Sequence, residues 1–98
     1  MLTYLKEFNI TDDQIKDIIS TYDNNLLKNL NFSKRNVNEI INYLIDFGVE
    51  DIYNVLKNRI DLFFMPVSLV KQNFTKLDKS MLVYILNNSV DDLINYNI

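Results

Sequence analysis

One apolar pattern recurs three times along this chain of 98 residues and limits how it can fold. Counted from Ile15, apolar residues follow at offsets of 3, 4, 11 and 12 positions, and the same offsets hold from Ile52 and from Leu82. Another apolar residue stands five positions before each of these origins. Chance alone does not explain so regular a pattern in a chain with 48% hydrophobic residues. The pattern therefore predicts an internal repeat.

The start of each repeat has the chemistry of a helix N-terminus. Thr11 and Gln14 fit a capping box, in which each side chain bonds the backbone amide of the other residue. The second repeat begins after Gly48 with two acidic residues, and the third begins after Asp78, a good N-cap. Offsets 0, 3 and 4 place apolar residues on one side of a helix. Each repeat is therefore predicted to begin with an amphipathic helix.

Each of these helices is followed by a polar break and then by a pair of bulky apolar residues. The pairs suit a short helical turn that enters the core; they are Leu26-Leu27, Phe63-Phe64 and Leu93-Ile94. Two repeats then continue into a second helix. We expect these helices over residues 34–46, with Ser33 as N-cap, and over 66–76, with Pro66 at the first position. Residues 4–8 are expected to form a short leading helix.

Composition favours helices throughout. One Gly and one Pro are too few for a turn-rich sandwich or barrel, and the absence of Cys and His excludes disulfides, histidine bases and the usual zinc sites. We predict a single all-α domain, residues 1–98, built as a short right-angled stack of helical hairpins with about two and a half solenoid-type repeats. The repeats would span approximately residues 8–46, 47–76 and 77–98.

The segment from Leu44 to Ile52, with the sequence LIDFGVEDI, resembles the repeat of the mitochondrial transcription termination factor (mTERF) family. That repeat has a leucine-rich helix, a glycine turn and a new helix that opens with acidic residues. It also contains a short helical turn with paired large apolar residues, as at Leu26-Leu27 and Phe63-Phe64. The resemblance covers residues 8–96. It implies a repeat of two helices, and it implies nucleic-acid binding, since family members look basic along a groove that faces nucleic acid.

A mildly basic middle region could serve such binding. Residues 28–79 hold eight Lys or Arg against six acids, although the whole chain carries a net charge of −3. Cationic side chains would contact phosphates and tyrosines would stack on bases. The candidates are Lys28, Lys34, Arg35, Tyr43, Tyr53 and Lys57. Because the chain as a whole is acidic, we favour a solvated face for these residues over nucleic-acid contact.

Adjacent acidic residues occur at Asp12-Asp13, Glu50-Asp51 and Asp91-Asp92. Neighbouring side chains on a helix point about 100° apart, so such a pair does not converge on one metal ion. Each pair also lies at a predicted helix N-terminus, where carboxylates are stabilising. We therefore predict no metal and no cofactor. On a surface that binds a partner, acidic side chains could instead imitate phosphates: Asp12, Asp13, Asp17, Asp91 and Asp92.

Residues 81–86 are apolar on all sides, which is typical of a helix that is buried all round. Met81, Val83 and Tyr84 would then either fold beneath the earlier repeats or form an interface with a partner or a second copy of the chain. We favour internal burial for so short a chain, with the interface as the alternative. Arg59 is expected to act at a helix end rather than to contact a ligand.

No spacing brings acid–base groups into one pocket, so we predict a non-enzymatic helical interaction module. A protein partner ranks first, with the chain as a small regulator or inhibitor, and nucleic-acid binding is the alternative. Because the chain lacks a signal-peptide pattern and any long apolar run, we expect a cytoplasmic protein with no membrane contact. The many Asn and Ile residues, with no Ala, indicate an AT-rich genome.

Overall fold

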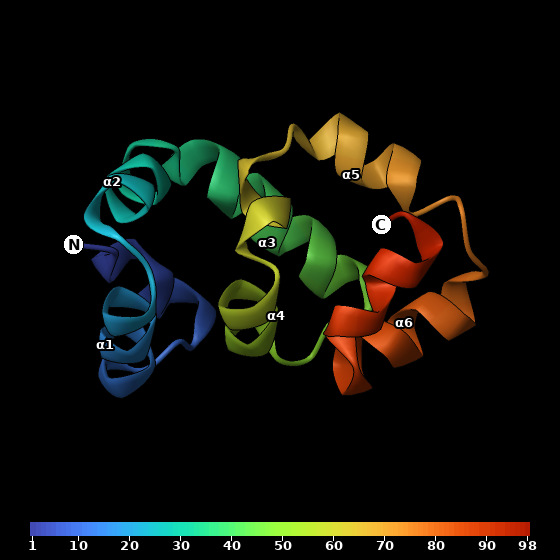
Figure 1. Cartoon of the computed structure of the whole chain (residues 1–98), viewed down its shortest axis with the longest axis horizontal. Coiled ribbons are helices and arrows are strands. Elements are labelled where there is room, and N and C mark those ends of the chain that lie inside the picture. The colour runs from blue at the N-terminus through green and yellow to red at the C-terminus, as the bar shows by residue number, and fades with distance from the viewer.

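The computed structural model describes residues 1–98, and every regular element in it is a helix, which confirms the all-α class. Six α-helices and three 3-10 helices follow one another (Figure 1). In chain order they are η1 (Thr3–Phe8), α1 (Asp12–Thr21), α2 (Asn24–Phe32), α3 (Lys34–Phe47), α4 (Ile52–Asn58), η2 (Ile60–Phe64), α5 (Val67–Asn73), α6 (Lys79–Asn88) and η3 (Val90–Tyr96). None of these helices has the length and hydropathy that a membrane span requires.

The order of the elements recurs along the chain. A helix, a second helical segment and a further helix follow one another as α1–α2–α3 and again as α4–η2–α5, and α6–η3 begins the series a third time. We call these three series the first, second and third units. The leading helix expected at residues 4–8 is present as η1. The elements gather into a body with extents of 36 × 23 × 23 Å.

Side chains cap the first helix of every unit, as predicted. Thr11 and Gln14 form the complete capping box of α1, with both bonds between 3.0 and 3.1 Å. Asp51 accepts a hydrogen bond from the Asn54 amide at the start of α4, and Asp78 accepts one from Met81 at the start of α6. These caps satisfy amides that a helix leaves without a partner in its first turn. The N-terminal signals in the sequence were therefore reliable.

The connection after α1 differs from the expected short turn. Asp23 accepts a hydrogen bond from the Leu26 amide and begins a full α-helix, α2, whose Leu27 and Leu30 are buried. Ser33 stands at the N-cap position of α3, as predicted, but its side chain makes no capping bond. Instead the chain bends at Ser33 and continues directly into α3, and the Val37 amide bonds the Ser33 carbonyl. At α5, Pro66 precedes the helix, which ends at Asn73, three residues before the predicted end.

The core consists of hydrophobic side chains alone. The origin and the +3 position of the pattern are buried in all three units, and 26 residues are buried in total. In each bulky pair only one member enters the core; the buried members are Leu27, Phe63 and Leu93. Phe64 and Ile94 are 37% and 71% exposed, and Leu26 is only partly buried against the core. Each of the three segments thus enters the core, as predicted, through one residue of its pair.

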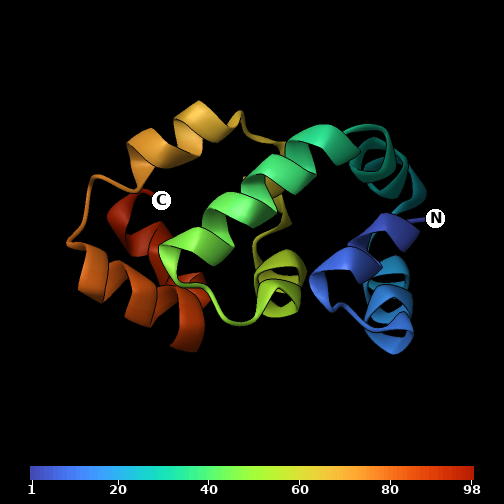
Figure 2. The ribbon, with the colours of Figure 1, turned by 180° about the vertical axis from the view of Figure 1, so that it is seen from behind.

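Helix α3 lies in the middle of the molecule and joins the first unit to the second (Figures 1 and 2). It contacts α2, α4, η2 and α5, whereas α1 packs on α4 and η1. Helix α6 packs on η3, which in turn contacts α4. Tyr4 adds a polar tie between η1 and α2, since its hydroxyl donates to the Leu30 carbonyl at 2.8 Å.

Gly48 ends α3 and sets the course of the chain into α4. Its φ of 122° is a conformation that side chains with a Cβ rarely adopt, and its amide bonds the carbonyls of Leu44 and Ile45. A Cβ at this position would lie 3.3 Å from Val83 Cγ1 on α6. Next to it, the Asn87 side chain donates to the Gly48 carbonyl at 3.0 Å and accepts from the Glu50 amide at 2.9 Å. This junction therefore joins the second and third units.

Replacing this glycine is expected to destabilise the protein. Gly48→Ala forces a residue with a Cβ into a positive φ and against Val83, which should lower the free energy of unfolding by about 1–3 kcal/mol. Urea denaturation measures the change. Ser68→Ala, at an exposed position of α5, serves as control and should change stability little. If Val83 contributes through contact, Gly48→Ala with Val83→Ala will cost less than the two single changes together. Unchanged stability in Gly48→Ala would contradict the strained junction.

Candidate functional site

The structure joins candidates that the sequence assigned to two different functions. Asp17 on α1, proposed for a protein partner, accepts hydrogen bonds from Tyr53 and Lys57 on α4, both proposed for nucleic acid. Lys57 Nζ lies 2.6 Å from Asp17 Oδ2, and the Tyr53 hydroxyl donates to the same oxygen. Lys57 Nζ also lies 5.9 Å from the centre of the Tyr53 ring. These three side chains therefore hold α1 against α4.

The contacts within this cluster shift the pKa of each member. The hydrogen bond from Lys57, followed by that from Tyr53, holds the pKa of the Asp17 carboxyl below its usual value. The hydrogen bond between Lys57 and Asp17 also raises the pKa of Lys57. In the same way, the hydrogen bond between Tyr53 and Asp17 raises the pKa of the Tyr53 phenol. All three groups keep their ordinary charge state near neutral pH. The shifts thus indicate a structural cluster rather than a poised acid or base.

The other acidic candidates lie on two distant parts of the molecule. Asp12 forms an ion pair with Lys6 at 2.7 Å, and the hydrogen bond from Lys6 lowers the pKa of Asp12. Asp13 is exposed beside it on α1 and has no ion-pair partner. Asp91 and Asp92 are exposed in the first turn of η3, which packs on α6 and α4, and Figure 1 shows α6 well away from α1 along the long axis. The five acidic candidates therefore do not form one phosphate-like surface.

The basic candidates also separate into groups. Lys28, Lys34 and Arg35 are exposed around the bend between α2 and α3, where Arg35 approaches Glu39 at 3.8 Å. Phe32 stands at the same bend and is 87% exposed. The sequence analysis missed this aromatic residue, although its position two residues after buried Leu30 places it on the opposite side of α2.

Tyr43 lies near the other end of α3. Its ring centre is 5.7 Å from those of Phe47 and Phe74, and Lys71 Nζ lies 5.5 Å from it. Burial raises the pKa of the Tyr43 phenol. This ring thus takes part in an aromatic cluster between α3 and α5, and the six basic and aromatic candidates do not line a single groove.

Helix α6 is not buried on all sides, which corrects the favoured interpretation of residues 81–86. Met81 is 44% exposed and Tyr84 is 66% exposed, whereas Leu82, Ile85 and Leu86 are buried. Val83 is half-buried and faces Gly48, so it belongs to the contact between units. The prediction of internal burial is wrong for Met81 and Tyr84, because α6 packs on the molecule through one side only. Ile94 of η3, 71% exposed, adds a further apolar side chain to this unit.

Arg59 has a structural role, although it does not cap a helix through its side chain. Its guanidinium donates two hydrogen bonds of 3.0 Å to the Asp61 carboxylate and one of 2.6 Å to the Ile98 carbonyl. The bond from Arg59 lowers the pKa of Asp61. The residue therefore fixes the end of η3 to the segment between α4 and η2.

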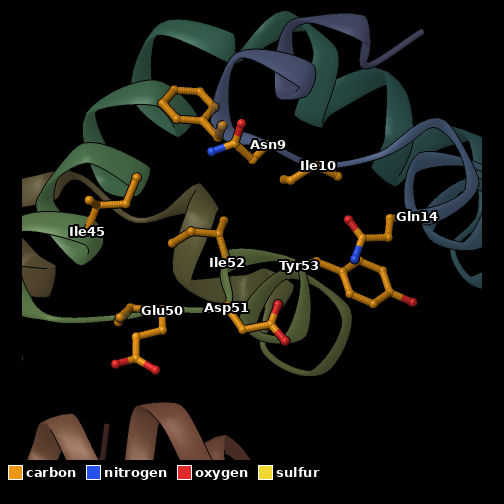
Figure 3. A pocket seen from close by; sticks show the side chains of 10 residues that line it. Asn9, Ile10, Gln14, Ile45, Glu50, Asp51, Ile52 and Tyr53 are labelled. Carbon is orange, nitrogen blue, oxygen red and sulfur yellow. The ribbon is translucent and has the colours of Figure 1, made fainter.

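A cleft of about 260 Å³ opens where η1, α3 and α4 meet (Figure 3). Six of its ten lining residues are hydrophobic, and Figure 3 shows Ile45 and Ile52 opposite Asn9 and Ile10 across the hollow. The lining residues are Phe8, Asn9, Ile10, Gln14, Ile45, Val49, Glu50, Asp51, Ile52 and Tyr53. Sequence reasoning did not find this cleft, since two segments that are distant in the chain, residues 8–14 and 45–53, build it and no local spacing marks it.

The polar groups of the cleft offer acceptors but no cation. Glu50 and Asp51 lie on one side of the cleft, and neither forms an ion pair. Asp51 uses Oδ1 to cap α4, while the Asn9 side chain projects toward the hollow (Figure 3). Nowhere in the molecule do three or more Asp or Glu side chains gather in a way that could hold a metal ion. The arrangement suits binding through apolar contact and carboxylate acceptors.

No family model, no curated protein and no solved structure matches the chain.

The Asp17 cluster predicts a specific dependence of stability on pH. Because the pKa of Asp17 is lower in the folded state, its contribution is present above the unfolded value of about 3.9 and is lost as the pH falls through the folded value below it. Asp17→Asn should therefore lower the melting temperature at pH 7, and the difference from wild type should shrink below about pH 4. Thermal denaturation followed by circular dichroism measures both.

Glu7→Gln provides the control, because it removes one negative charge from an exposed residue of η1 that has no ion-pair partner. It should leave the melting temperature near that of wild type across the same pH range. Equal effects of the two substitutions would show that net charge, rather than the contact between α1 and α4, accounts for the difference.

Proposed function

We propose that this protein is a non-enzymatic interaction module that binds a protein partner through its third unit. The observation that carries this proposal is the exposure of three large apolar side chains there: Met81 at 44%, Tyr84 at 66% and Ile94 at 71%. We call these three residues the α6–η3 surface. Met81 and Tyr84 lie one turn apart on α6, and α6 packs against the 3-10 helix that carries Ile94.

Exposed apolar side chains of this size support a protein-binding surface. Tyrosine is enriched among the residues that dominate binding energy at interfaces, because its ring buries a large area at little cost in conformational entropy. Exposed apolar groups that are rimmed by polar residues are typical of interaction sites. The Tyr84 ring is two-thirds exposed near the middle of α6, which makes it the first candidate for such a contact.

Acidic residues extend the same surface. In a 3-10 helix, residues three apart lie on one side, so Asp91 and Ile94 of η3 share a side. Asp91 and Asp92 have no ion-pair partner within the chain. A partner with an apolar patch beside basic residues would complement this combination. A small regulator or inhibitor that acts in the cytoplasm fits such a surface.

The recurring order of elements supports a finer proposal about architecture. We propose that residues 8–46, 47–76 and 77–98 are solenoid-type repeats arranged as stacked helical hairpins, similar to the mTERF repeat. The buried pattern positions shared by the three units support this, namely Ile15 and Ile18, Ile52 and Val55, and Leu82 and Ile85.

The bend between α2 and α3 favours nucleic acid as a second candidate partner. Phe32 is the most exposed large apolar side chain in the protein and stands beside Lys28, Lys34 and Arg35. An exposed ring can stack on a base while cations contact phosphates, which is how many proteins bind single strands. We call these four residues the Phe32 corner.

Substitution at the α6–η3 surface tests the first proposal. A tagged protein would be incubated with nuclease-treated lysate, and bound proteins identified by mass spectrometry. Tyr84→Ser should reduce the amount of the captured partner at least tenfold, as expected for a central interface residue worth about 2 kcal/mol or more. Leu69→Ser, which changes an exposed apolar residue of α5, should retain the partner. Capture that is unaffected by Tyr84→Ser would contradict the proposed surface.

Salt dependence tests the second proposal. Single-stranded RNA binding, measured by fluorescence anisotropy, should weaken steeply as salt rises and be lost when Lys34 and Arg35 are both replaced by Glu. Phe32→Ala should weaken it about fivefold or more through loss of stacking. Lys16→Glu with Lys79→Glu makes the same change in net charge away from the Phe32 corner and should have a smaller effect. Equal loss in both double variants would indicate a nonspecific charge effect.

A further inference from the structure

We infer that the cleft between η1, α3 and α4 binds one basic side chain, arginine or lysine, of a protein partner. This inference rests on the proposed function, because it supplies a second contact point for the same kind of partner. The cleft combines an apolar surface with unpaired carboxylates, and no Lys or Arg is among its lining residues. Of the residues that the sequence assigned to a protein or nucleic-acid partner, only Tyr53 lines the cleft. Its hydroxyl already donates a hydrogen bond to Asp17.

The size of the cleft limits what it can hold. Pockets for small molecules and cofactors commonly have volumes of about 300–1,000 Å³. At about 260 Å³, and open to solvent along its rim, this cleft fits one long side chain better than a cofactor. The occupant is therefore expected to be part of a larger molecule that makes further contacts outside the cleft.

The apolar part of the cleft matches an aliphatic stem. Ile10 and Ile52 are buried at its base, and Ile45 projects into it while still 44% exposed (Figure 3). Phe8 adds a partly buried ring at the edge. Lysine and arginine commonly lay their methylene groups along such surfaces and keep the charged end in water. Covering Ile45 in this way would remove exposed apolar area.

The polar part matches a cationic end. Asp51 commits one carboxylate oxygen to the Asn54 amide and leaves the other without a partner, and Glu50 uses only its backbone amide, in a bond to Asn87. Figure 3 shows the Asp51 carboxylate beside the hollow, whereas the Glu50 side chain points away from it. The Asn9 amide, at a residue with a φ of 62°, projects from the opposite side. The guanidinium of an arginine in the cleft could donate to the free Asp51 oxygen, while the charge of Glu50 nearby adds a favourable field.

A pair of matched probes tests this inference on the full chain. The protein would be labelled with ¹⁵N and titrated with Nα-acetyl-arginine amide, and separately with Nα-acetyl-citrulline amide, its uncharged analogue of the same shape. The arginine probe should shift the amide signals of Asn9, Ile45 and Ile52 in a saturable way. The citrulline probe should bind roughly three- to tenfold more weakly, since it lacks the charge.

Removal of the carboxylates should abolish the difference between the probes. Glu50→Gln with Asp51→Asn keeps an acceptor at the start of α4, because Asn is as good an N-cap as Asp. Asp91→Asn with Asp92→Asn makes the same change in net charge elsewhere and should leave the preference for arginine intact. Ile45→Ser should weaken both probes, because it removes the surface for the stem. If this variant fails to fold, the two carboxylate variants still decide the question.

Three results would overturn the inference: equal binding of the two probes, shifts centred outside the cleft, or equal effects of the two charge variants. Its failure can be told apart from failure of the proposed function, since the titration needs no partner. If arginine binds in the cleft but Tyr84→Ser does not affect capture, the cleft stands and the α6–η3 surface does not. If capture depends on Tyr84 while the probes show no preference, the reverse holds.

Discussion

Burial of one side of α3 is the interaction on which the other helices depend. Val37, Ile40, Ile41 and Leu44 lie along this side and are wholly buried. Helix α3 has 14 residues, whereas no other helix has more than ten. Isolated helices shorter than about 12–15 residues are marginal in water, so the shorter elements hold their shape through packing. Four of them contact α3 directly, and α1 and η3 reach it through α4.

The features that the sequence predicted correctly are local ones. The Thr11 capping box, the end of α3 at Gly48 and the buried origins of the pattern each depend on residues within one or two helical turns. The features that it missed depend on distant partners. Asp17 meets Tyr53 and Lys57, which lie 36 and 40 positions later, and the cleft combines two distant segments, residues 8–14 and 45–53. No spacing rule reports such contacts before the helices are packed.

A charge count over a stretch of sequence was misleading for the same reason. The basic excess of residues 28–79 suggested one continuous face, but the structure divides these cations among separate elements and gives several of them carboxylate partners. Lys57 forms an ion pair with Asp17, Arg59 forms one with Asp61, and Arg35 lies near Glu39. What remains at the bend between α2 and α3 is a small group around Phe32, an exposed residue that a count of charges does not register.

The same pairing explains why negative charge stays available at the cleft. Two cations on elements that border the cleft are engaged elsewhere: Lys6 of η1 with Asp12, and Lys57 of α4 with Asp17. Glu50 and Asp51 therefore lack an internal partner, and the short connection that carries them is fixed between Gly48 and the cap of α4. Carboxylates held in place beside exposed apolar surface lose little further freedom when a cation binds. A preference of the cleft for arginine or lysine then requires no movement of the backbone. It requires only that the partner present a side chain with both a positive charge and an aliphatic stem.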